Sequence, residues 1–580
     1  MASSASYFLR LPPELRNAIY REYVLVDGGY VFNARTEKLR KATAQGHGDA
    51  NGAIDLSLMY TCRQVASEMK GVALGANLVT FRTLYRDDLR IRAGRYVGLI
   101  DQLDYLTAAA ACLAYKICSR QVRALIVARY PWFEPYLDLA EATNTRSDRR
   151  IVPPFQATEW VTASYFTKRQ GSQIRCPSLV REAALFTLRT CLEREGLRDA
   201  LEEEWRIMSG FCLPIKVRQN MPDFLALTAR HTHWTFPSQS DVDTLFELLH
   251  DEYSCTYGHM YDNDDCRTLT KEIRDLNLSM FVSGFKDAKY RFSAATAAIR
   301  FFELFPGIHR DMRSILIHED RDAVPCSASH GRGLVRFCME NPLLRIERRV
   351  DLWRNVFLDS MGHRIDQRFA ETDDWLDEKH PTLRRKPTTR AIGRWVMEAA
   401  ELDQMPPHCF RLTLDGGAPG PANVCSDLFQ HWVQASAAEQ MALRLTMDRG
   451  LPMTGGPRAH IKRTRDTENL GTPPAMYFET GSSGFPDELS KIVAGTSVVG
   501  CLNFSPGSPH DVEEIIRARH GWTAKEWWDS AELMTRFPDR FTVPTFFNPV
   551  SPLPQWIELL MHNLLDYDSA RQYAIDEGYL

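Results

Sequence analysis

The residues best suited to chemistry lie between positions 250 and 266, where His250, Cys255, His259 and Cys266 are interleaved with aspartates. Thiolate and imidazole side chains are the ligands that a tetrahedral zinc site uses. Their spacing, with four, three and six intervening residues, lacks the paired C-x-x-C arms of zinc fingers and ribbons. We therefore interpret the segment as a surface loop with incidental thiols, and metal binding is the alternative.

Motifs for phosphate binding and for nucleophilic catalysis are incomplete in this sequence. The stretch Gly495–Gly500 has the outer glycines of a phosphate-binding loop, but no lysine follows them. The stretch Gly481–Gly484 is one residue shorter than the G-x-S-x-G turn of serine hydrolases. We accordingly assign no catalytic residue and no cofactor.

If the chain is an enzyme of unrecognised type, its site must be assembled from residues distant in the sequence. The first candidates are His318, Glu319, Asp320 and His330, because they end or follow a predicted strand over Met312–His318. A solvated loop explains the same residues equally well. An enzyme therefore remains an alternative to a protein that acts by binding other proteins.

Composition limits the class of protein. Over 580 residues, 44% are hydrophobic and 25% are charged, which excludes a disordered chain or a coiled-coil rod. A net charge of −4 gives no general reason to bind nucleic acid. No secretory signal or 20-residue apolar run is evident, and the 13 cysteines include no C-x-x-C pair, so we expect an intracellular protein, cytoplasmic or nuclear, with reduced thiols and no membrane span.

The first 90 residues predict a compact module. Pro12-Pro13-Glu14 is typical of a helix start, and a helix to about Val26 places Leu15, Ile19 and Tyr23 on one face. A turn and a hairpin strand at Tyr30–Phe32 follow. A second helix over Leu58–Val72 and a strand over Asn77–Phe81 complete the module.

The remainder is predicted to be largely helical. Apart from Met312–His318, the one further strand expected is Ile126–Ala128, and Arg345–Phe357 is expected to form an amphipathic helix. We therefore predict an α+β, mainly α fold: an N-terminal helix-hairpin-helix-strand module (1–90), a large helical body (91–405) and a loop-rich C-terminal part (406–580). The strongest helix predictions are Leu106–Ile117, Ser178–Glu195, Asp199–Met208, Asp241–Leu249 and Ala294–Leu304.

Three sequence blocks of the N-terminal module resemble the F-box-like domains of large fungal protein families. The first is F-L-R-L-P-P-E-L-R-N-A-I-Y from Phe8 to Tyr20. The second is L-M-Y-T-C-R-Q-V-A-S-E from Leu58 to Glu68, and the third is the strand Asn77–Phe81. The first block is also similar to the related fungal domain named for two E-x-R motifs. The resemblance covers about Tyr7 to Phe81, and nothing in the remaining residues resembles a family.

The resemblance implies a protein partner. In F-box proteins these helices dock on a Skp-type adaptor, which links them to a cullin-RING ubiquitin ligase while the rest of the chain selects a substrate. Carried over, the resemblance implies a role as a substrate receptor, and a scaffold with no ubiquitin role is the alternative. The residues that would lie at or behind the interface with the adaptor are Leu11, Pro12, Pro13, Leu15, Ile19 and Val65.

Overall fold

The fold is described from a computed structural model of the whole chain. The ranges that the structure describes are 7–42, 52–131, 177–194, 196–203, 221–249, 289–360, 385–402, 405–449, 484–522, 559, 562–563 and 567–576. The predicted thiol and imidazole segment 250–266 lies outside these residues.

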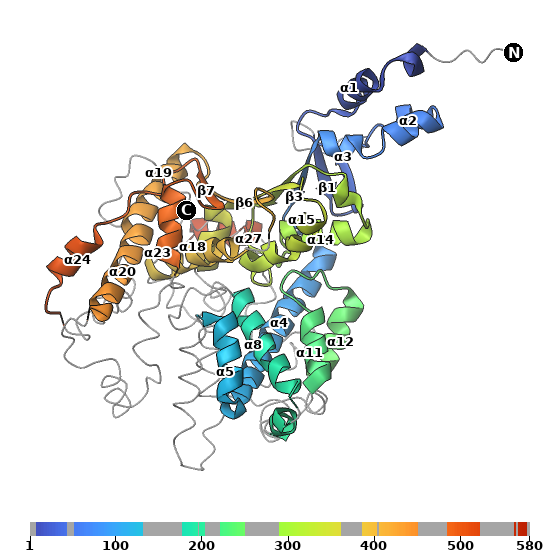
Figure 1. Cartoon of the computed structure of the whole chain (residues 1–580). Helices are drawn as coiled ribbons and strands as arrows, with labels where there is room; N and C mark the ends of the chain where they lie inside the picture. The colour runs from blue at the N-terminus through green and yellow to red at the C-terminus, as the bar shows by residue number, and fades with distance from the viewer. Residues whose placement is uncertain are drawn as a thin grey trace.

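A seven-stranded sheet has the strand order β2-β1-β3-β4-β5-β6-β7. Figure 1 labels four of its strands, β1, β3, β6 and β7. Only the pairing of β2 with β1 is antiparallel, and every other neighbouring pair is parallel. The strands are β1 (Tyr30–Asn33), β2 (Lys38–Lys41), β3 (Leu78–Arg82), β4 (Ser314–Glu319), β5 (Arg345–Asp351), β6 (Phe410–Asp415) and β7 (Val499–Leu502).

The parallel strands follow one another across the sheet in chain order, so each crossover steps in the same direction. Right-handed crossovers that all step one way place their helices on the same face of a sheet. Burial alternates accordingly along β5, where Ile346, Arg348 and Val350 are buried while Glu347 and Arg349 are half-buried. Strands β4 and β5 therefore have a core face and a more accessible face.

A helical insertion separates β3 from β4. Its entry and exit lie side by side, because Leu84 and Phe292 exchange backbone hydrogen bonds of 2.8 and 3.2 Å. In Figure 1 its helices gather on one side of the sheet. Among the described residues they include α4 (Asp87–Ile117), α5 (Arg120–Arg129), α8 (Pro177–Leu192), α11 (Met221–Arg230) and α12 (Gln239–Leu249).

The remaining helical segments flank the strands. Before β3 lie η1 (Tyr7–Arg10), α1 (Pro13–Val24), η2 (Ser57–Tyr60), α2 (Arg63–Glu68) and α3 (Val72–Ala76). Around β4 and β5 lie α14 (Ala294–Leu304), η4 (Ile308–Arg310), η5 (Ser327–Leu334), α15 (Val335–Glu340), the π-helical turn η6 (Leu352–Val356) and α16 (Phe357–Ser360). Then come α18 (Arg385–Ala400), α19 (Pro419–Leu428), the π-helical segment η8 (Phe429–Gln434), α20 (Ala435–Asp448), α23 (Phe485–Val493), α24 (Val512–Ala518) and α27 (Tyr567–Asp576).

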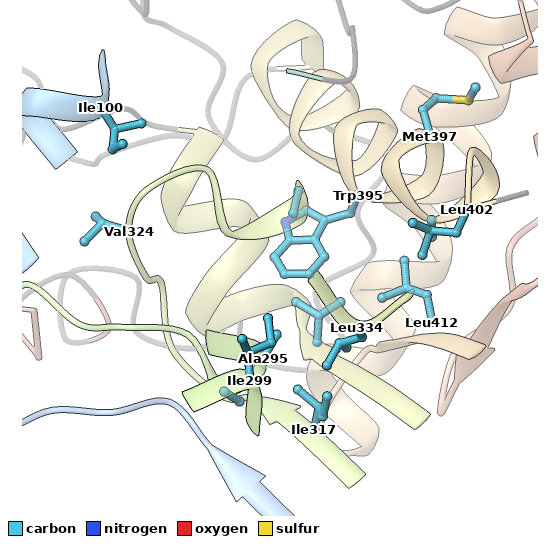
Figure 2. Close-up of a cluster of buried hydrophobic side chains, with 14 of the residues drawn as sticks. Ile100, Ala295, Ile299, Ile317, Val324, Leu334, Trp395, Met397, Leu402 and Leu412 are labelled. Carbon is cyan, nitrogen blue, oxygen red and sulfur yellow. The ribbon is translucent and has the colours of Figure 1, made fainter. Parts of the chain in front are cut away.

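The main core lies between the sheet and these helices. Figure 2 shows Trp395 of α18 among Leu334, Leu402 and Leu412, with Ile317 of β4 nearby. Arg348 enters this core from β5, and its guanidinium lies 4.6 Å from the centre of the Trp395 ring. Burial of an arginine here requires a partner, which Glu319 supplies at 2.6 Å.

The prediction of a mainly α protein with a separate hairpin module is wrong. The structure is a largely helical α/β protein, and the N-terminal strands β1 to β3 belong to the same sheet as β4 to β7. The predicted helix Arg345–Phe357 is instead strand β5 followed by η6 and the start of α16. Its apolar residues Ile346 and Val350 are four positions apart, a spacing that fits a helix face and also one face of a strand.

Of the other predicted helices and strands, some are confirmed and some are wrong. The strand expected at Ile126–Ala128 lies inside helix α5. The helix expected over Leu58–Val72 is divided into η2, α2 and the start of α3. Helix α14 has the predicted bounds Ala294–Leu304, and β3 and β4 lie where strands were expected.

Candidate functional site

Helix α1 has a polar-aromatic inner face and an apolar outer face. Arg16, Tyr20 and Val24 recur every four residues and are at most 6% exposed. Leu15, Ile19 and Tyr23 precede them by one position each. Because consecutive residues lie about 100° apart around a helix, this second set points to another side.

The inner face is held by a polar cluster centred on Glu68 of α2. Arg16 donates from Nε and Nη2 to the two oxygens of Glu68 at 2.8 and 2.6 Å. The hydroxyl of Tyr20 donates to Oε2 of Glu68 at 2.8 Å. Hydrogen bonding from Arg16 lowers the pKa of Glu68 to about 2. These motif residues therefore join α1 to α2.

A small core of its own supports the helical segments η1, α1, η2, α2 and α3, which without the strands between them are called the N-terminal module below. Tyr20, Val24, Val65 and Met69 form this cluster, which is separate from the main core. Asn77 connects the module to the sheet, since its side-chain amide donates to the carbonyl of Val24 at 2.9 Å and its oxygen accepts from the backbone of Val26 at 2.8 Å. The module thus projects from one edge of the sheet as a unit (Figure 1).

The outer face of α1 is accessible. Leu15 is 52% exposed, Ile19 41% and Tyr23 39%. Because they lie at positions i, i+4 and i+8, they form one apolar stripe along the helix, which we call the outer stripe. Charged and polar residues usually occupy the solvent-facing side of a helix, so an apolar stripe there offers a surface to which a partner could bind.

The predicted partner-binding residues lie around this stripe. Leu15 and Ile19 belong to it, Pro12 and Pro13 are exposed at the start of α1, and Leu11 is half-buried beside them. Val65 is 2% exposed and packs in the small core. Its side chain therefore supports the helices from behind the outer face.

The residues considered for an enzyme site meet only in part: Glu319 and His330 both contact the start of α14, whereas His318 lies on the other face of the sheet. Glu319 is fully buried and accepts hydrogen bonds from Arg348 and from the first backbone amide of α14, Ala294, at 2.6 and 2.8 Å. His318 precedes it on β4 and so lies on the opposite face of the sheet. The two side chains consequently cannot act on one substrate.

His330 has a structural role, because each of its ring nitrogens has a hydrogen-bonding partner in the core. One ring nitrogen lies 2.6 Å from the hydroxyl of Ser293, and the other lies 2.6 Å from the carbonyl of Pro325. Burial lowers the pKa of His330 well below its usual value. The ring is therefore neutral near pH 7 and links the start of α14 to the segment before η5.

A cluster that the sequence did not suggest joins the helical insertion to η5. Nε2 of His233 lies 2.7 Å from Asp104, and Nδ1 lies 3.1 Å from the hydroxyl of Ser329. The three residue types are those of an acyl-transfer triad. Each is at most 4% exposed, and Ser329 donates to the carbonyl of Cys326 at 2.9 Å, so the cluster is closed to a substrate. His233 is 129 positions from Asp104 and 96 positions from Ser329 in the sequence, so local spacing could not predict that the three residues meet.

The ranges that the structure describes hold neither a cluster of metal ligands nor a helix that could span a membrane. Within those ranges, no three histidine, cysteine, aspartate or glutamate side chains come together as a metal site would require. No helix of the described part has the length and apolarity needed to cross a bilayer.

Comparison of the chain with protein-family models, with curated proteins and with solved structures finds no match. The outer stripe and its supporting cluster are therefore interpreted from their own geometry.

Proposed function

We propose that this chain acts by binding a protein through the N-terminal module, as an F-box-like receptor that docks on a Skp-type adaptor of a ubiquitin ligase. The observation that carries the proposal is the outer stripe, in which Leu15, Ile19 and Tyr23 are 39 to 52% exposed. The sequence resemblance supplies the type of partner. The rest of the chain would then be available to bind a substrate.

The polar and the apolar motif residues of α1 have different roles, and this difference supports the proposal. The polar motif residues Arg16 and Tyr20 are occupied by Glu68 of the same chain. The apolar motif residues Leu15 and Ile19 contribute little to the small core that Tyr20 and its neighbours form. Covering the exposed parts of two such side chains stabilises a complex by about 1–3 kcal/mol.

The test is the affinity of the purified full chain for a Skp-type adaptor, measured by calorimetry. The double variant L15D/I19D places two charges in the outer stripe and is expected to weaken binding by roughly 100-fold or more. Since both positions are accessible, the variant should keep the circular dichroism spectrum of the wild type.

A matched control is available on the same helix. Asn17 and Arg21 are exposed but lie on the side of α1 away from the stripe. The variant N17D/R21Q changes the net charge by −2, as L15D/I19D does, and is expected to bind normally. Failure of the folded wild type to bind, or equal weakening by both variants, would contradict the proposal.

A further inference from the structure

Helices α14 and α18 pack on one face of the sheet. The ring centres of Phe301 in α14 and Phe81 in β3 are 5.7 Å apart, and Arg348 of β5 lies over the ring of Trp395 in α18. Phe81 and Arg348 lie on the same face, because each is paired with Ile317 of β4. Successive residues of a strand point to opposite faces, so the alternate positions of β3 to β6 point away from these helices. We call the surface that they form the open face.

The open face carries a group of arginines. They are Arg82, Arg345, Arg349 and Arg411. His318 of β4 is paired with Arg82 on one side and with Arg349 on the other. Because neighbouring strands lie about 4.8 Å apart, these three side chains form one row across the sheet.

Two of the arginines carry positive charge that no carboxylate compensates. Arg82 and Arg411 are exposed, and neither side chain has a hydrogen bond or an ion pair with another residue that the structure describes. Arg349 instead binds Glu347 of the same strand, with Nε and Nη2 at 3.1 and 3.0 Å from one carboxylate oxygen. Glu347 is therefore occupied, and Arg82 and Arg411 remain available to an anion.

The sheet fixes the separation of these two arginines. Arg82 is level with Thr413 of β6, which is two residues beyond Arg411. Three strand spacings of about 4.8 Å and two residues of about 3.3 Å place their Cα atoms roughly 16 Å apart. An extended peptide covers this distance in about five residues. The side chain of Arg411 lies across the neighbouring strand, because a Cβ atom at Gly500 of β7 would collide with its guanidinium.

Carboxylates form a border at the carboxyl ends of the strands. Asp320 directly follows β4, and Asp351 and Asp415 end β5 and β6. Each accepts a hydrogen bond from a backbone N–H, at 2.8 to 3.3 Å. A nucleic acid carries a phosphate at every nucleotide, so this border would repel its backbone. The open face of β3 to β6 also has no aromatic side chain on which a base could stack, and both features favour a peptide.

We propose that the open face binds an acidic peptide segment of a partner protein, with Arg82 and Arg411 each holding a carboxylate of that segment. A guanidinium forms two parallel hydrogen bonds with a carboxylate, which gives this contact both strength and direction. The acidic residues of the segment lie about five positions apart, to match the two arginines. The site belongs to the sheet and not to α1, so the proposal does not depend on binding to an adaptor. Within the proposed function, the acidic protein is the substrate.

The test is the affinity of the purified full chain for a fluorescent peptide, measured by anisotropy. The peptide has about twelve residues of glycine and serine with two pairs of glutamates about five positions apart, and the control peptide has glutamines at these places. The wild type is expected to bind the glutamate peptide, more weakly as the salt concentration rises, and not to bind the glutamine peptide.

Two matched variants locate the site. R82Q/R411Q is expected to weaken binding of the glutamate peptide by roughly 10-fold or more. R120Q/R189Q removes two exposed arginines of α5 and α8, and so changes the net charge equally, but it should bind as the wild type does. L15D/I19D should also bind the peptide normally, which separates this proposal from the one on the adaptor.

Three outcomes would overturn the proposal. The first is equal binding of the glutamate and glutamine peptides by the wild type, and this outcome does not depend on the folding of any variant. The second is equal affinity of R82Q/R411Q and R120Q/R189Q, both with the circular dichroism spectrum of the wild type. The third is tighter binding of a single-stranded RNA of the same net charge, weakened by R82Q/R411Q, since the open face would then bind nucleic acid.

Discussion

Individual residues of the N-terminal motif have separate roles, and Glu68 provides the clearest test. Its pKa is lowered from 4.5 to about 2, with hydrogen bonding from Arg16 as the largest cause. A carboxyl whose pKa is lower in the folded state stabilises the fold fully above its unfolded pKa, and this contribution is lost as the pH falls toward the folded value. We therefore expect α1 and α2 to lose protection from hydrogen exchange progressively between pH 4.5 and about 2, after correction for intrinsic rates.

In the variant E68Q, the protection of α1 and α2 from hydrogen exchange should no longer depend on pH in this range. Exchange in both helices should already be faster at neutral pH, and the melting temperature should be lower by several degrees. The reason is that Arg16, which is 6% exposed, loses the charge that compensates it. The control is E22Q, because Glu22 is an exposed glutamate on α1, the helix that carries Arg16. If E68Q and E22Q behave alike over this pH range, the cluster around Glu68 does not hold the module.

For single helices and strands, the spacing of apolar residues was a good guide to which side chains are buried. It was a poorer guide to whether the segment forms a continuous helix. Val65 and Met69 are buried and Leu58, Cys62 and Val72 pack against them, as their spacing indicated, although the helix is broken. Similarly, Ile346 and Val350 are buried, but in a strand. Burial of Arg348 obscured the alternation of β5, because an arginine is expected at the surface unless a partner such as Glu319 lies nearby.

The break between α2 and α3 depends on Gly71. Its φ is +77°, and a Cβ atom there would lie 2.7 Å from the carboxyl carbon of Asp311. In G71A the left-handed backbone costs about 1 kcal/mol, and the contact with Asp311 adds to this cost. We expect a lower melting temperature and faster exchange in α3. Gly307 is the matched control, because its φ is +83° but a Cβ would meet nothing within 4 Å. Equal destabilisation by G71A and G307A would show that the contact with Asp311 has no effect.

For the whole molecule, the sheet could not be derived from the sequence. Strand β3 pairs with β4, in which Leu316 lies opposite Thr80 although they are 236 positions apart. Short strands separated by a long helical insertion carry no local signal of their pairing, so β5 was expected to be a helix, and β6 and β7 lie in the part that was expected to be rich in loops. The outer stripe, in contrast, follows from local spacing, and the sequence indicated Leu15 and Ile19 without knowledge of the sheet.

In the whole molecule, the buried polar cluster of Asp104, His233 and Ser329 attaches the helical insertion to η5. Asp104 of α4 accepts a hydrogen bond from Arg181 of α8 and lies beside His233, whose ring contacts Ser329 of η5. Because Arg181 is 7% exposed, D104N leaves a buried cation without its carboxylate, which costs about 3–5 kcal/mol. We expect a lower urea midpoint and faster hydrogen exchange in both the insertion and η5.

The control is the same substitution at Asp243, which is 52% exposed and lies 3.3 Å from Arg95. It should lower the free energy of unfolding by less than about 1 kcal/mol. If D104N loosens the insertion but leaves η5 protected, His233 does not connect the two parts.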